Sequence, residues 1–124
     1  MCFWAASSGV RYTASKWALR GLTRSASLEL GTTRGIRVNA VMPGLVDTPL
    51  MESAPAAFFD AALAEIPLGR VGTPADVAPT VVFLLSDASA YYNGAELVID
   101  GGMAAHVTHK RIADATRPVP EAVG

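Results

Sequence analysis

The sequence predicts an α/β fold built on a parallel sheet, and it predicts only part of such a domain. A helical repeat over residues 12–30 leads into an apolar, β-branched run over residues 36–42. The same order recurs further on, with a helix start at residues 73–76 and a second β-rich run over residues 95–99. Two strands cannot form a stable parallel sheet alone, because such sheets bury both faces and protect their edges. We therefore expect these elements to belong to a larger α/β domain.

The first helix is predicted from an apolar or small residue at every fourth position. This row consists of Ala14, Ala18, Leu22, Ala26 and Leu30, and Gly31 is its predicted C-cap. Arg20 and Arg24 lie on a neighbouring face, where we expect a solvated or subunit-facing stripe. The strand that follows ends at Pro43-Gly44, a dipeptide that breaks regular structure.

The segment from residue 43 to residue 73 is predicted to be irregular, apart from a short helix over residues 56–65. Thr73-Pro74-Ala75-Asp76 is a helix start, with threonine as N-cap, proline in the first turn and aspartate reaching back to the cap. This helix runs to about Ser86, and Pro79 removes one of its backbone donors. A domain over residues 1–102 and a loose tail over residues 103–124 complete the predicted organisation.

Composition excludes several classes of function. The chain has 124 residues and a net charge of -1, so it is one small domain at most and lacks the basic excess of a nucleic-acid binder. A single cysteine, Cys2, excludes a disulfide framework and a multi-thiolate metal site. No apolar run approaches the ~20 residues that span a bilayer, so we expect a cytoplasmic protein. His106 and His109 have no third ligand nearby, and no metal site is predicted.

Tyr12 and Lys16 are the pair with the greatest chemical interest. They are one helical turn apart, so their side chains share a face at about 5–6 Å between Cβ atoms. A phenol ordinarily titrates near pH 10, and an ammonium ~4 Å away contributes about 4 kcal/mol only in a partly buried site. The pair is therefore useful for proton transfer only inside a cleft. The spacing fits equally a solvated helix face with an aromatic residue at its start.

Three segments, in this order, resemble one family. YTASKWALRGLTRSASLEL, GIRVNAVMPGLVDTPL and PADVAPTVVFLLSDASAYYNGAELVIDGG resemble the C-terminal half of a short-chain dehydrogenase/reductase, over about residues 9–102. The resemblance implies a Rossmann-like, doubly wound parallel sheet that lacks its N-terminal dinucleotide-binding half. No glycine-rich GxGxxG turn occurs in the sequence. It also implies an oxidoreductase that transfers hydride between NAD or NADP and an alcohol or ketone.

The resemblance assigns roles residue by residue. Tyr12 matches the tyrosine that exchanges a proton with the substrate oxygen, and Lys16 matches the lysine that stabilises the phenolate and binds the nicotinamide ribose. The positions that match the cofactor-binding turn after the strand are Pro43, Gly44, Val46 and Thr48. The residues alone would assign Pro43-Gly44 only a turn. The family's catalytic serine has no counterpart, because Ser7 and Ser8 stand too close to the tyrosine. The family's asparagine, which comes from a more N-terminal helix, has no counterpart either.

Two hypotheses follow. The first is an N-terminally truncated NAD(P)-dependent oxidoreductase, acting on a small and possibly hydrophobic alcohol or ketone. An apolar loop would line its substrate pocket or, equally, cover the sheet; it contains Leu50, Met51, Phe58 and Phe59. The second is a catalytically inactive subunit-association module. Both expect a homo-oligomer or an association with a full-length relative.

Overall fold

The structure is an α/β arrangement around a short parallel sheet. The computed structural model describes residues 9–51 and 55–105. The chain forms, in order, α1 (Gly9–Arg34), β1 (Ala40–Pro43), α2 (Ala56–Glu65), α3 (Pro74–Leu85) and β2 (Glu96–Ile99). β1 and β2 pair in parallel, with Ala40 opposite Glu96 and Pro43 opposite Ile99. The predicted α/β class and parallel pairing are confirmed.

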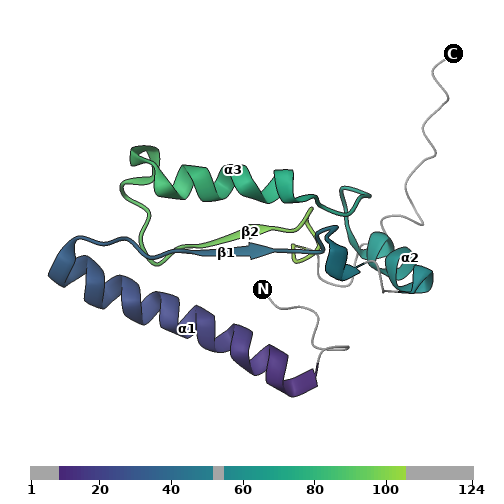
Figure 1. Ribbon diagram of the computed structural model, residues 1–124, viewed down its shortest axis with the longest axis horizontal. Helices are drawn as coiled ribbons and strands as arrows, with labels where there is room; N and C mark the ends of the chain where they lie inside the picture. Colours follow the sequence, from purple (N-terminus) through teal and green to yellow (C-terminus); the bar gives the residue numbers. More distant parts are fainter. Residues whose placement is uncertain (1–8, 52–54, 106–124) are drawn as a thin grey trace, which may run out of the picture.

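The two long helices cover opposite faces of the sheet and run against the direction of the strands (Figure 1). Because of this direction, the N-terminal turns of α1 and α3 lie at the edge where β1 and β2 end. Ligands of open α/β folds bind at this carboxyl edge of the strands. The fold therefore places the start of α1, with Tyr12, at the edge where chemistry is expected.

The first helix is longer than predicted and has a different cap. α1 continues to Arg34, and the chain leaves it at Gly35, which has a φ of 65°. The Gly35 N–H donates to the Gly31 carbonyl at 3.2 Å. Gly31 as the C-cap was therefore wrong: Gly35 takes the left-handed conformation that ends the helix.

The first strand is shorter than the predicted 36–42, because its early residues bond to a loop instead of to β2. The Val38 N–H donates to Asn93 Oδ1 at 2.9 Å, and the Asn39 side-chain amide donates to the Tyr92 carbonyl at 2.9 Å. Ladder pairing starts only at Ala40. Over this stretch, bonds of two asparagine side chains and one backbone bond, from the Gly94 N–H to the Val38 carbonyl at 2.7 Å, join the chain to the loop.

The remaining elements follow the local sequence rules. α2 covers the predicted residues 56–65, and α3 begins at the predicted position after Thr73. The Asp76 carboxylate accepts from the Thr73 N–H at 2.7 Å and from its hydroxyl at 2.8 Å. Pro79 lies inside α3. The predicted domain boundary and tail stay predictions, since residues 106–124 lie outside the described part of the chain.

Little of the apolar surface in the described residues is buried. The buried apolar residues are Met42, Ala62 and Ile66, while Trp17 is 55% exposed and Leu28 is 74% exposed on α1. Large exposed apolar side chains such as these are candidates for an interface. Among the helices of the described segments, none has the length and apolar character needed to cross a membrane.

Candidate active site at the carboxyl edge of the sheet

Tyr12 and Lys16 open into one cavity between α1 and β1. The cavity has a volume of about 190 Å³ and is lined by Tyr12, Lys16, Leu19, Arg20, Ala40, Val41, Met42 and Pro43. The Lys16 ammonium lies 5.2 Å from the centre of the Tyr12 ring, within range of a cation–π contact. Tyr12 is 44% exposed and Lys16 is half-buried. The helical spacing therefore brings a phenol and a cation together in a partly enclosed site.

Arg20 is not part of a solvated stripe, and this correction changes the electrostatics of the site. Its guanidinium donates to both oxygens of the Glu96 carboxylate, from Nε at 2.8 Å and from Nη2 at 2.6 Å. Arg20 is only 21% exposed and Glu96 14%. The hydrogen bonds from Arg20 hold the pKa of Glu96 below its usual range. Arg24 remains 68% exposed, with Nη2 3.5 Å from the same carboxylate.

Gly44 has a packing role that the sequence did not indicate. Its N–H donates to the Ile99 carbonyl at 2.9 Å, which joins the chain after β1 to the end of β2. A Cβ at this position would lie 2.6 Å from the Asp100 Cβ and 2.7 Å from its Cα. Glycine is therefore required here because the two strand ends approach each other closely.

Val46 and Thr48 lie further along the loop and do not line the Tyr12 cavity. Val46 pairs with Gly72 through a parallel bridge, and its side chain lines a second cavity of about 150 Å³. The Thr48 carbonyl accepts from the Met51 N–H at 2.7 Å, and Thr48 lines neither cavity. Of the predicted site residues, Tyr12, Lys16 and Pro43 thus line the first cavity, Val46 lines the second, and Gly44 and Thr48 line neither.

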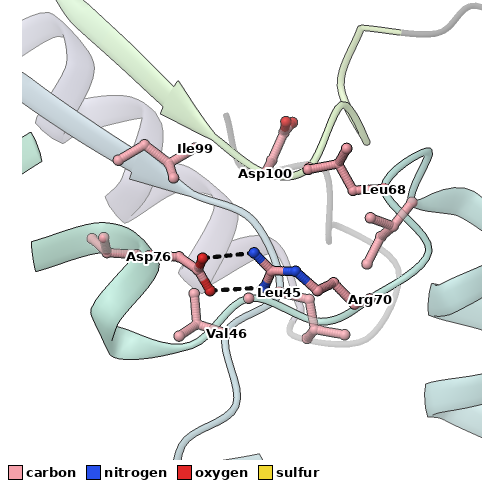
Figure 2. A pocket seen from close by; sticks show the side chains of 11 residues that line it. Leu45, Val46, Leu68, Arg70, Asp76, Ile99 and Asp100 are labelled. Atoms are coloured by element: carbon pink, nitrogen blue, oxygen red, sulfur yellow. Dashed lines mark hydrogen bonds and ion pairs between the residues drawn. The ribbon is translucent and has the colours of Figure 1, made fainter. Parts of the chain in front are cut away.

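An ion pair between Arg70 and Asp76 borders the second cavity (Figure 2). Arg70 Nη1 and Nη2 donate to the two Asp76 oxygens at 2.8 and 2.7 Å. These bonds, together with those from Thr73, hold the pKa of Asp76 well below its usual range. Sequence reasoning found Asp76 as a helix cap and missed Arg70, which follows a turn and belongs to no periodic pattern.

This pair predicts a pH-dependent stability. A carboxylate whose pKa is depressed on folding stabilises the fold above its unfolded pKa, about 4, and loses that effect as the pH falls through the folded value. Asp76→Asn should therefore lower the melting temperature at pH 7, with a difference from wild type that shrinks below about pH 4. Asp60→Asn, at an exposed position on α2, is the matched control and should change the melting temperature little. A difference that stays constant with pH would contradict the assignment.

The other predicted features that lie in the described residues line neither of these cavities. The Phe58 and Phe59 rings meet edge to face at 5.7 Å, are half-buried and line neither cavity. Within the described ranges, no group of three His, Cys, Asp or Glu residues could hold a metal ion. Cys2, His106 and His109 lie outside these ranges, as does the side chain of Leu50.

Comparison with known proteins supports the resemblance. Residues 4–104 match a family model described as enoyl-(acyl carrier protein) reductase. A 3-alpha-(or 20-beta)-hydroxysteroid dehydrogenase of Mycobacterium tuberculosis is 50% identical over 98 residues, which are 79% of this chain and 35% of that protein. The chain spans little more than a third of the length of the curated relatives that it matches.

Solved structures give the same result for the fold. A short chain dehydrogenase family protein from Francisella tularensis is 36% identical, with a TM-score of 0.73 over 85% of this chain and 48% of that one. A 4-hydroxyisoleucine dehydrogenase complexed with NADH is also 36% identical, with a TM-score of 0.73 over 77% of this chain and 40% of that one. Sequence, fold and the Tyr12–Lys16 cavity therefore agree: the chain belongs to the short-chain dehydrogenase/reductase family.

Proposed function

We propose that these residues serve an NAD(P)-dependent oxidoreductase that interconverts an alcohol and a ketone. The observation that carries the proposal is the cavity that Tyr12 and Lys16 share between α1 and β1, in a chain of this family. The chain would correspond to the C-terminal half of such a domain, with the adenine and pyrophosphate site supplied by other residues.

The residues present fit the nicotinamide end of a dinucleotide. The cavity runs along β1 as far as Pro43, at the carboxyl edge of the sheet, and it offers a phenol and an ammonium, which suit hydroxyl groups of a ribose. When bound, the nicotinamide accepts or supplies the hydride. Lys16 would hold the ribose, and the turn formed by Pro43, Gly44, Val46 and Thr48 would contact the carboxamide.

Within this proposal, Tyr12 handles the proton. Its phenol gives a proton to the carbonyl oxygen in reduction and takes one from the hydroxyl in oxidation. The Lys16 ammonium lowers the free energy of the phenolate, and the partial burial of the cavity strengthens that attraction. The two side chains act together because one helical turn separates them.

We infer an apolar alcohol or ketone as the substrate class. One relative is named for hydroxysteroids and the family model for an enoyl-(acyl carrier protein) reductase, and these two names favour an apolar substrate. The structural relative named for 4-hydroxyisoleucine is the polar alternative that the assay has to exclude. We also infer a cytoplasmic location, which agrees with the content of one cysteine.

A homo-oligomer, or a complex with a full-length relative, is the proposed assembly. One outer seam of α1 is exposed at positions that alternate by three and four residues: Val10, Ala14, Trp17, Gly21, Arg24 and Leu28. This spacing is the seam of a helix that packs on another helix. The same seam favours the alternative function, an association module without catalysis.

One preparation of the protein tests both the proposed activity and the proposed assembly. The protein that carries this sequence is purified from its source cells, sized by light scattering and assayed with NADH and NADPH against hydroxysteroid, oxoacyl and short-chain ketones. Turnover of an apolar ketone with a mass above one chain supports the proposal. No turnover with either cofactor in an associated protein supports the association module, and a monomer contradicts the proposed assembly.

A further inference from the structure

The contacts of α1 with the rest of the fold are concentrated at a few polar groups. Among the α1 residues whose burial is described, Ser27 alone is buried. Near the end of the helix, Asn93 Nδ2 donates to the Ser27 carbonyl at 3.0 Å. In the middle of the helix, Arg20 is held by Glu96 at the start of β2. Apolar packing therefore does little to fix how α1 slides along the sheet.

The Arg20–Glu96 pair has the geometry of a fixed attachment. Two parallel N–H···O bonds set both the distance and the orientation of the guanidinium, which a single bond would not do. The guanidinium also lies 4.3 Å from the centre of the Trp17 ring, so one of its faces is covered. Both partners are largely buried, and solvent therefore screens the attraction less than at an open surface.

The attachment lies one strand length away from the reacting end of the helix. Arg20 is two helical turns from Tyr12, about 12 Å along the axis. Glu96 stands opposite Ala40, at the amino end of the sheet, and Pro43 is at the carboxyl end. With Arg20 beside Glu96, Tyr12 and Lys16 therefore reach the cavity beside Pro43. Because Asn93 holds the helix at Ser27, the Arg20–Glu96 pair sets the register of the N-terminal half of α1 alone, and a shift of that half would remove Tyr12 from the cavity.

We propose that the Arg20–Glu96 ion pair is a positioning device that fixes the register of the N-terminal half of α1 against the sheet and so places Tyr12 and Lys16 at the carboxyl end of β1. Its catalytic consequence rests on the proposed function, whereas the register itself does not. Arg20 acts here through Tyr12 and Lys16, although it lines the same cavity.

The glutamate also neutralises a row of like charges. Lys16, Arg20 and Arg24 follow one another at intervals of four residues, an arrangement in which neighbouring cations repel. The Glu96 carboxylate contacts both arginines. Its negative charge therefore offsets the repulsion between Lys16 and Arg20. Loss of Glu96 should therefore disturb the helix as much as loss of Arg20.

Hydrogen exchange of the protein that carries this sequence tests the register without any assay of activity. Arg20→Gln should speed amide exchange over residues 13–19 by at least about tenfold, because a charge-assisted pair is lost. Residues 25–33 should keep their rates, since Asn93 still holds Ser27. Arg24→Gln is the matched control: it removes a cation one turn away that contacts the same carboxylate at 3.5 Å and is 68% exposed. Arg24→Gln should leave the amide exchange rates of both segments unchanged.

Two further variants keep the test decisive. The double variant Arg20→Glu with Glu96→Arg swaps the two charges, and it should return the amide exchange rates of residues 13–19 toward those of the wild type. If Arg20→Gln fails to fold, Arg20→Lys is measured in its place, because lysine keeps the charge and loses the bidentate geometry. Equal exchange in Arg20→Gln and wild type would overturn the proposal. So would an acceleration spread evenly over the whole chain, which would mean that the pair contributes to stability alone.

In the active protein, the same Arg20 substitution connects register to turnover. Arg20→Gln should lower kcat by about tenfold with little change in KM, and Arg34→Gln, at an exposed position in the last turn of α1, should change neither. Unaltered kcat alongside faster exchange over residues 13–19 would overturn the catalytic consequence. An absence of turnover in the wild-type protein would count against the proposed function, while the exchange result would still decide the register.

Discussion

Tyr12→Phe should lower the kcat of the active protein by about 10²–10⁴-fold, the usual contribution of a positioned acid or base. The change removes one oxygen and keeps the ring on which the Lys16 ammonium lies at 5.2 Å. The helix and the cavity wall therefore remain, and KM should change little, because the phenol assists proton transfer more than binding. Steady-state kinetics in both reaction directions measure the effect, since one group serves as donor and acceptor.

Tyr91→Phe supplies the matched control. It is the same chemical change at a side chain that is fully exposed and lines neither cavity. The kcat of Tyr91→Phe should equal that of the wild type. The melting temperatures of Tyr12→Phe and Tyr91→Phe should both be close to that of the wild type. A Tyr12→Phe protein with undiminished turnover would remove Tyr12 from the proposed mechanism and leave the cavity as a binding feature only.

Local rules predicted the elements whose structure is decided by neighbours in the sequence. The start of α3 was predicted because threonine, proline and aspartate at 73, 74 and 76 satisfy the free N–H groups of a helix end among themselves. The start of β1 was not, because Val38 and Asn39 bond to the loop around Asn93. Those partners are more than fifty residues away, and no local pattern identifies them.

The candidate site also contains one pair that local sequence rules predict and one pair that only the fold creates. The shared face of Tyr12 and Lys16 follows from helical periodicity, so it could be predicted before the fold was known. The Arg20–Glu96 pair joins residues 76 positions apart, and only the register of α1 on the sheet creates it. A charged residue on an amphipathic helix is most often solvated, which is why the sequence assigned Arg20 to a surface stripe.

Gly44 has two separate reasons to be glycine, the cofactor-binding turn of the family and the close packing of the strand ends. The resemblance assigns this glycine to the cofactor-binding turn, and the structure supplies a separate reason that holds without any cofactor. The loop after β1 runs against Asp100 at the end of β2, so a side chain has no room. The same close approach makes the Gly44 N–H bond to Ile99 possible at 2.9 Å. Stability and binding can therefore be separated by experiment at this position.

Gly44→Ala should destabilise the chain by about 1–3 kcal/mol, the usual cost of forcing an extra carbon into a packed site. The new Cβ would meet the Asp100 Cα at 2.7 Å, and a backbone atom cannot move aside as a flexible side chain can. The two strand ends would have to separate, which would strain the bond from Gly44 to Ile99. Urea unfolding measures the effect as a lower midpoint with an unchanged slope.

Gly21→Ala is the control that separates packing from the simple addition of a methyl group. Gly21 lies in the middle of α1, and a Cβ there would have no atom within 4 Å. Alanine should therefore stabilise the helix by roughly 0.5–1 kcal/mol, so the two substitutions are expected to have opposite signs. A Gly44→Ala chain as stable as the wild type would mean that the strand ends can separate without cost. The glycine would then have to be explained by what binds at the turn, and loss of NAD(P)H turnover in that stable variant would support this explanation.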